Sequence, residues 1–282
     1  MHVPTFPSAL SLPFSLASPL PLRATAVDAL VLAGHLLLYP TGVLAERTTG
    51  AAAEHAPDGR PGAAPHPTDR PPVLLLHGFC DNRSAYVLLR RSLLRYGWRH
   101  VAALNHSPLT GDVRAAARRL AGHVEDACAR TGHERVDLVG HSLGGLIARY
   151  YVQRLGGDAR TRTVITLGTP HSGTRAAPVL PAHPVARQMC PGSPLLAELA
   201  EPVPGGCRTR FVSFWSDADA LMIPRETARL DHSDLHVRNI AVRGVGHMTL
   251  PVDCAVSARI RAELGARSGV RPASPGAPAD VA

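Results

Sequence analysis

The residues best suited to do chemistry surround Ser142. The stretch Gly140-His141-Ser142-Leu143-Gly144 fits Gly-x-Ser-x-Gly, a pattern that on its own also arises by chance in Gly/Ser turns. Apolar residues at 136, 138 and 139 favour a buried strand before it, and apolar residues at helical spacing follow from Leu143 to Tyr151. Where a strand enters a helix through so short a turn, the side chain of the central turn residue is held above the sheet. Glycines on either side have no Cβ that would clash with the crossing segments. The sequence therefore predicts that Ser142 is a nucleophile.

A serine nucleophile needs a base and an acid, and the chain offers candidates for both. A serine hydroxyl is a weak nucleophile unless a base takes its proton, and the base needs an anion to orient it. When the serine stands at a strand-to-helix turn, the acid and then the histidine follow it along the chain. Of the 15 histidines, His247 is the best candidate base because it lies in a Gly-rich loop after the last predicted strand. Asp217 and Asp219 compete for the acid, since both follow the predicted strand 211–215.

Other histidines are expected to have different roles. Two stand beside motif glycines and are expected to pack or to form hydrogen bonds, namely His77 and His141. Three fall on predicted loops and are expected at the surface, namely His171, His232 and His236.

Strands and helices alternate around these residues. Apolar segments predict strands at 72–76, 100–104, 136–139, 163–167, 211–215 and 239–242. Helical spacing predicts helices near 84–96, from 112 to a stop at Gly132, and from 143 to about 155. Such alternation predicts an α/β fold with a mostly parallel sheet and helices on both faces. Ligands of these sheets bind at the carboxyl ends of the strands, where the motifs fall.

Composition excludes several other classes of function. Hydrophobic residues make up 45% of the chain, enough for a proper core. The net charge of +8 comes from 30 basic residues that are all arginine, and they are scattered rather than interleaved with aromatic residues, so nucleic-acid binding is not expected. The 5 cysteines lack metal-site spacing, and no metal or organic cofactor is expected. Cys190 and Cys207 bracket a Pro/Gly-rich stretch and could pair if the protein is exported.

The domain organisation is expected to have four parts. Residues 1–47 form an N-terminal extension whose apolar run, 26–44, predicts a helix that packs on the domain or makes a peripheral contact with a membrane. Residues 48–70 predict a flexible linker, 71–266 the catalytic domain and 267–282 a disordered tail. The start of the chain is rich in Pro and Ser and has no basic residue before Arg23, unlike an ordinary signal peptide. A monomer is expected, exported or membrane-peripheral rather than cytoplasmic.

Five motifs in order give the chain a resemblance to a known family. They are Leu76-His77-Gly78-Phe79, Gly140-His141-Ser142-Leu143-Gly144-Gly145, Thr166-Leu167-Gly168-Thr169-Pro170, Ser216-x-x-Asp219 and Gly244-Val245-Gly246-His247. From about 71 to 265 the chain resembles the small bacterial lipases of the lipase A type, a class 2 lipase group of the α/β-hydrolase superfamily. The N-terminal extension and a longer segment before the strand 211–215 depart from that family's pattern and leave the substrate range open.

The resemblance implies a reaction and a site. It selects Asp219 over Asp217 as the acid, through the Ser-x-x-Asp spacing, and completes a triad with Ser142 and His247. Ester hydrolysis passes through an oxyanion, whose donors are expected to be the backbone N–H groups of Leu143 and Phe79. The implied function is a serine carboxylic ester hydrolase, a lipase or esterase, acting on acyl esters or lipids through an acyl-enzyme. A thioesterase or acyltransferase with the same triad stays open, as does a non-catalytic binding protein, although the latter predicts a broken triad.

The longer segment, 172–210, is predicted to shape substrate access. It contains seven prolines between Pro178 and Pro204, so long regular elements are not expected. Because it leaves the sheet at its carboxyl edge, it is expected to form a lid or fixed cap near Ser142, with Leu195 and Leu196 as substrate-binding residues. The alternative is a surface loop remote from the site.

Overall fold

Six parallel strands form the centre of the molecule. The computed structural model describes residues 19–43, 70–79, 81–105, 111–177 and 183–266, so the predicted linker and the predicted tail lie outside the described residues, apart from Arg70. The strand order is β2-β1-β3-β4-β5-β6, and every neighbouring pair is parallel. The strands are β1 (Val73–Leu76), β2 (Val101–Leu104), β3 (Val136–His141), β4 (Thr161–Leu167), β5 (Arg210–Ser216) and β6 (His236–Val242). Each predicted strand is present, and the α/β fold class is confirmed.

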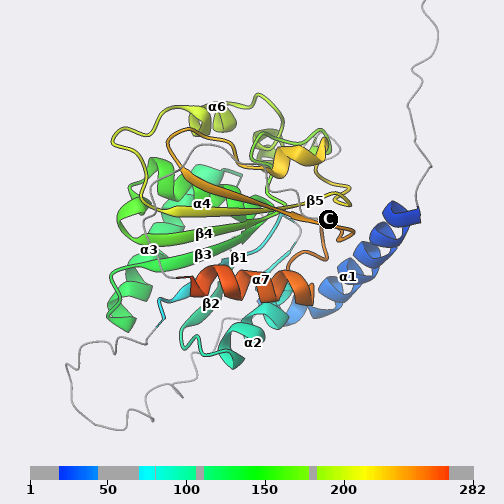
Figure 1. Ribbon diagram of the computed structural model, residues 1–282, viewed down its shortest axis with the longest axis horizontal. Helices are drawn as coiled ribbons and strands as arrows, with labels where there is room; N and C mark the ends of the chain where they lie inside the picture. The colour runs from blue at the N-terminus through cyan, green and yellow to red at the C-terminus, as the bar shows by residue number, and fades with distance from the viewer. Residues whose placement is uncertain (1–18, 44–69, 80, 106–110, 178–182, 267–282) are drawn as a thin grey trace, which may run out of the picture.

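Helices cover both faces of this sheet, as the alternating pattern predicts (Figure 1). The larger ones are α1 (Pro19–Val43), α2 (Val87–Arg95), α3 (Val113–Thr131), α4 (Leu143–Arg154) and α7 (Cys254–Gly265). Shorter ones are α5 (Pro184–Gln188), α6 (Pro194–Ala200) and the 3-10 turns η1 (Arg83–Tyr86), η2 (Gly157–Ala159) and η4 (Arg225–Ala228). The sequence did not predict α7.

Two apolar layers hold the helices to the sheet. Side chains of β1 alternate between them, with Leu74 and Leu76 in the layer of α3, α4 and α6, and Val73 and Leu75 in the layer of α2 and α7. Both layers are needed because β1 and β3 are buried along their whole length. The carboxyl ends of the strands are therefore the open edge at which a site can form.

The helix α3 shows how local sequence sets these bounds. The side chain of Asp112 caps its first turn by accepting from the N–H of Arg114 at 3.0 Å. Gly132 ends it with a φ of 71°, a left-handed conformation that suits glycine. Its buried residues recur at the helical spacing that the sequence predicts, and they are Val113, Ala116, Ala117, Leu120, Val124, Ala127 and Cys128.

The N-terminal helix α1 lies along the outside of the domain, beside η1 and the loop that contains His247 (Figure 1). It is longer than the predicted run and includes Pro40. Its residues 23–42 have a mean hydropathy of 1.3 and are long and apolar enough to cross a membrane, a test that a signal sequence also passes.

Candidate active site

The turn from β3 into α4 places Ser142 in a strained conformation. Its φ is 52° and its ψ is −117°, and among the described residues it is the one non-glycine residue with a positive φ. A Cβ on Gly140 would lie 2.5 Å from the carbonyl carbon of Gly144, and a Cβ on Gly144 would overlap the carbonyl oxygen of Leu76. The two motif glycines are therefore required by the close approach of β1, β3 and α4, as the sequence predicts.

Ser142 and His247 both line one apolar pocket. The pocket has a volume of about 300 Å³. Its walls include Gly78, Phe79, Asp81, His141, Thr174, Ala176, Ala177, Ala186, Met189, Leu221, Met222 and Met248. Most of this surface is apolar, so the pocket suits a hydrocarbon chain better than a charged ligand.

His247 is held by a buried carboxylate on the loop after β5. Its Nδ1 lies 2.8 Å from Oδ2 of Asp219, whose other oxygen accepts from the N–H groups of Leu221 and Met222, each at 2.9 Å. Asp217, the competing acid, is exposed and accepts from the N–H of Gly244 at 2.7 Å. The structure thus brings Asp219, and not Asp217, to His247.

The charges around His247 favour its protonated form. Burial alone would lower its pKa, but the charge and hydrogen bond of Asp219, with smaller contributions from Asp28 and Asp81, raise the pKa above 6.5. Burial would raise the pKa of Asp219, yet His247 and two backbone N–H groups keep it below its usual value. An imidazole in this setting takes up a proton readily while its carboxylate stays ionised.

The two residues predicted to supply oxyanion donors both lie close to Ser142. Leu143 is the first residue of α4, where helical N–H groups have no acceptor within the helix. Phe79 lines the pocket, and the adjacent Gly78 lies so close that a Cβ there would be 3.4 Å from Cβ of Ser142. Leu143 follows the serine directly, and Phe79 follows the glycine that packs against it.

A second buried histidine–carboxylate group, which the sequence analysis missed, adjoins this site. His141 donates from Nε2 to the carbonyl oxygen of His247 at 3.0 Å, and its Nδ1 stands 3.7 Å from Asp81. His35 of α1 lies 2.9 Å from the same carboxylate. Both histidines keep the pKa of Asp81 well below its usual range despite burial, which acts in the opposite direction. The hydrogen-bonding role predicted for His141 is thus confirmed.

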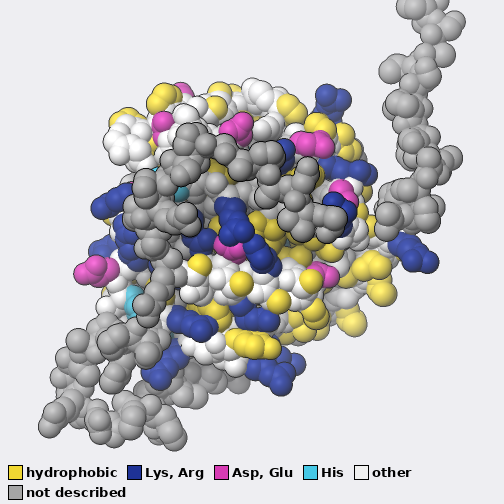
Figure 2. Space-filling model, viewed as in Figure 1, with side chains coloured by type: hydrophobic (Ala, Val, Ile, Leu, Met, Phe, Trp, Pro, Cys, Tyr) yellow, Lys and Arg dark blue, Asp and Glu magenta, His cyan; other side chains and the backbone are white. Residues whose placement is uncertain are grey.

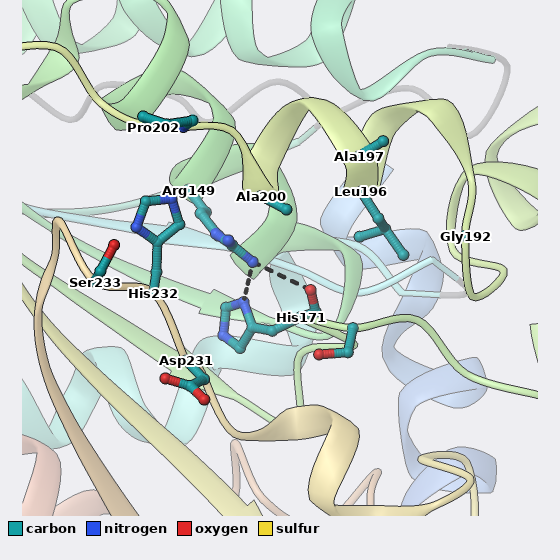
Figure 3. Close-up of a pocket in the computed structure, with 11 residues that line it drawn as sticks. Arg149, His171, Gly192, Leu196, Ala197, Ala200, Pro202, Asp231, His232 and Ser233 are labelled. Atoms are coloured by element: carbon teal, nitrogen blue, oxygen red, sulfur yellow. Dashed lines mark hydrogen bonds between the residues drawn. The ribbon is translucent and has the colours of Figure 1, made fainter.

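The predicted substrate-binding leucines do not line the Ser142 pocket. Leu195, on α6, is fully buried in the apolar core. Leu196 lines a different pocket, together with Arg149 and His171 (Figure 3). The earlier part of the segment 172–210 supplies the pocket walls instead, through Thr174, Ala176, Ala177, Ala186 and Met189. The prediction failed because apolar clustering marks burial but does not say against which layer.

Arg149 fastens the segment 172–210 to the domain. This cation is 3% exposed and donates to the carbonyl oxygens of Leu199 at 2.8 Å and His171 at 3.1 Å, and to the side chain of Gln153 (Figure 3). Burial lowers the pKa of Arg149 to about 9. The surface position predicted for His171 is wrong, because its ring is buried and lies 3.0 Å from the hydroxyl of Thr166.

Two further points concern the suggested disulfide and candidate metal ligands. Cys190 and Cys207 are both free thiols, and Cys207 donates to Asp158 at 3.1 Å, so the suggested disulfide is absent from the structure. Within the described part of the chain, no group of three or more His, Cys, Asp or Glu is arranged to hold a metal ion.

Comparisons with known proteins show the fold and a set of relatives. Residues 72–203 match the palmitoyl protein thioesterase family. Triacylglycerol lipases of Pseudarthrobacter phenanthrenivorans and Burkholderia plantarii are each 31% identical over 115 residues, which is 38% of this chain and 35% and 32% of theirs. The chain thus matches only about a third of the length of these relatives.

Solved structures resemble the chain over most of its domain. The mature form of a Bacillus licheniformis lipase has a TM-score of 0.59 at 17% identity, covering 73% of this chain and 96% of its own. A 2-hydroxy-6-oxo-6-phenylhexa-2,4-dienoate hydrolase from Rhodococcus sp. strain RHA1 has a TM-score of 0.50 at 14% identity, covering 69% and 90%. At these identities the likeness shows the fold alone, and that fold is the α/β-hydrolase fold.

Proposed function

We propose that this protein is a serine carboxylic ester hydrolase, a lipase or esterase, that works through Ser142, Asp219 and His247. The observation that carries the proposal is the placement of a strained serine and an Asp-bonded histidine in the wall of one apolar pocket. The triacylglycerol lipases among the relatives support the same class of reaction.

The geometry suits an acyl-enzyme mechanism. His247 takes the proton of Ser142 as the serine oxygen bonds to the ester carbonyl carbon, and the carbonyl oxygen becomes an oxyanion between the N–H groups of Leu143 and Phe79. Each such donor contributes about 10²–10³ to the rate. The carbon–alkoxy bond then breaks, and the leaving alcohol takes the proton from His247. Water repeats the sequence and releases the carboxylic acid, while Asp219 stays ionised throughout.

The substrate proposed is an acyl ester with a hydrocarbon chain. Side chains of Ala177, Met189, Leu221 and Met222 form much of the pocket wall and offer no charged partner to an acyl group. The five ordered motifs also support a place near the lipase A type.

A thioesterase is the second candidate, and one observation favours it specifically. Residues 72–203, which include Ser142, match the palmitoyl protein thioesterase family. A thioester of a long acyl group would occupy the same pocket and pass through the same oxyanion. A panel of p-nitrophenyl esters and acyl thioesters of equal chain length separates the two reactions by their ratio of kcat/KM.

Labelling with a fluorophosphonate tests whether the site is catalytic at all. The wild-type protein should form a covalent adduct at Ser142, and Ser142→Ala should form none. A protein that stays unlabelled and hydrolyses neither esters nor thioesters would be a non-catalytic binding protein. We also propose that the protein is monomeric and exported or membrane-peripheral, which gel filtration and cell fractionation test.

A further inference from the structure

The helix α1 turns its polar side inward and its apolar side outward. Asp28 and His35, seven positions apart, face the domain, and His35 is only 7% exposed. The outward side carries Val27, Leu30, Leu32, Leu36, Leu37 and Leu38, of which Leu30 is 73% and Leu37 81% exposed. A surface helix of a soluble domain has the opposite arrangement.

The apolar side is too broad for a single partner helix. Leu36, Leu37 and Leu38 are consecutive and all exposed, so at about 100° per residue they already spread over about half the circumference of the helix. A helix–helix seam uses a narrower stripe. An apolar medium that surrounds the outward half of the helix fits this distribution better.

Hydrogen bonds hold α1 against the domain from Asp28 to Gly42. Asp28 accepts from the N–H and the hydroxyl of Thr249 at 3.0 and 2.7 Å near one end. At the other end Asn82 donates to the carbonyl oxygen of Tyr39 at 2.7 Å and Asn105 to that of Gly42 at 2.6 Å. The helix therefore cannot cross a bilayer while it stays docked, but it can lie in the plane of one.

The charges next to the apolar side are positive. Arg23 is exposed at the start of α1, and the acidic residue Asp28 is turned inward. The helix α2, which follows the η1 turn that α1 contacts, exposes Val87 and Leu88 together with Arg91 and Arg95. Figure 2 shows apolar side chains gathered over α1 and basic side chains near α2. Apolar residues bordered by arginines are typical of a surface that binds anionic lipid.

We propose that α1 is an in-plane docking helix for an anionic lipid bilayer. Its outward leucines enter the boundary between headgroups and acyl chains, while its inner side stays bonded to the domain. Because Thr249, which Asp28 binds, follows the pocket residues His247 and Met248, docking also brings the loop that contains them near the lipid surface. This last consequence rests on the proposed function, whereas the docking does not.

Vesicle sedimentation of the full chain tests the docking. The wild type should pellet with phosphatidylcholine vesicles that contain phosphatidylglycerol and less with phosphatidylcholine alone. The triple variant Leu30→Ser/Leu36→Ser/Leu37→Ser should bind at least about tenfold more weakly, because three exposed leucines that would enter the bilayer are lost. Ala29→Ser/Ala33→Ser, on the same exposed side of the helix, is the matched control and should weaken binding far less, because it removes far less apolar area. Hydrolysis of a soluble short-chain ester should be equal in all three.

Three results would overturn the docking proposal. Wild type that does not pellet with either vesicle is one, and a triple variant that binds as well as the control is another. The third is light scattering that gives a wild-type dimer and a monomeric triple variant, since the leucines would then cover a second copy. An inactive wild type that still binds vesicles would overturn the proposed function and leave the docking intact.

The inner side of α1 carries a second, independent inference. Oδ1 of Asp28 binds Thr249 twice, and the Asp28 carboxylate fills the space that a Cβ on Gly246 would occupy, next to His247. We infer that Asp28 is a positioning residue for His247, through the loop it holds and the charge it brings. The inference rests on the proposed function for its effect on rate.

Two variants separate the hydrogen bonds between Asp28 and Thr249 from the charge of Asp28. Asp28→Asn keeps an oxygen for Thr249 but removes the charge, so the acid limb of the kcat/KM profile should move to lower pH. Thr249→Val removes one hydrogen bond and keeps the charge, so kcat should fall by about tenfold to a hundredfold with the limb in place. The charged and titratable groups that face His247 are Asp28, Asp219, Asp81 and His141.

An NMR titration of His247 gives the same comparison without enzyme activity. An acid limb and a titration midpoint that do not move in Asp28→Asn would refute the positioning role. So would an equal movement in Thr249→Val, since the charge would then not be the cause.

Discussion

Replacing Asp219 with asparagine tests the orientation of His247 more sharply than any deletion. Asparagine has the same shape, and its side-chain oxygen can still accept from the N–H groups of Leu221 and Met222, now 2.9 Å from the carboxylate. Its amide NH₂ then faces Nδ1 of His247, where the carboxylate oxygen stood at 2.8 Å. Two hydrogen-bond donors cannot share that contact, so the imidazole of His247 must adopt the tautomer with its proton on Nε2.

The expected loss follows from that tautomer. With Nε2 protonated, His247 cannot take the proton of Ser142, and kcat should fall by about 10⁴, or about 5.5 kcal/mol of transition-state stabilisation. The melting temperature should move by less than about 4 °C, because the backbone contacts survive. Removing the negative charge also lowers the pKa of His247, so the residual activity should extend to lower pH.

Steady-state kinetics on a soluble p-nitrophenyl ester measures the loss, and Asp217→Asn is the matched control. Asp217 is exposed, and its carboxylate binds only Gly244 among the contacts described, so its variant should keep activity within a few-fold. A loss in Asp219→Asn of less than tenfold, or an equal loss in Asp217→Asn, would refute the assigned acid and the tautomer argument together.

Four further predictions concern the pH profile, the turn, the core and the pocket. The kcat/KM of the wild type should decline on the acid side with a midpoint above 6.5, since Asp219 holds the pKa of His247 above that value and only the neutral ring accepts a proton. Gly140→Ala should lower the free energy of unfolding by about 3 kcal/mol or more in urea titrations, because its Cβ meets backbone that cannot move aside. Leu195→Ala should destabilise by about 2–5 kcal/mol and reduce hydrolysis of short and long esters equally. Met189→Trp should instead narrow the pocket and reduce hydrolysis of long-chain esters selectively, which a chain-length series of p-nitrophenyl esters would reveal or exclude.

The parts of the fold and site that could be predicted from the sequence depend on local chemistry. Asp112 and Gly132 are strong helix signals, and the structure uses both as caps. The turn at Ser142 is equally local, since its glycines are required by contacts within a few residues and with the first strand. Asp219 was selected by a spacing, and its contact with His247 agrees.

The parts that could not be predicted depend on which surface an apolar residue meets. Leu195 and Leu196 were predicted to line the substrate pocket but pack elsewhere. The periodicity of apolar residues indicates which face of a helix is buried, but not which surface that face packs against. His171 was predicted at the surface because no residue near it in the sequence indicates that the buried Arg149 lies beside it. For α1 a signal did exist: Asp28 and His35 share one side of the helix, which indicates a polar inner face.

The hydrogen bonds between α1 and the His247 loop have a consequence for how the chain is made. Asp28 and Thr249 are separated by 221 residues, so at about 5–20 residues per second the ribosome completes the second partner roughly 10 to 45 s after the first. Throughout that interval the carboxylate of Asp28 has no partner on the His247 loop, whereas Asn82 and Asn105, which bind the other end of α1, are already synthesised. A chaperone or a nearby bilayer therefore meets the Asp28 end of the helix before the His247 loop exists. Vectorial synthesis thus separates the docking of the two ends of α1 in time.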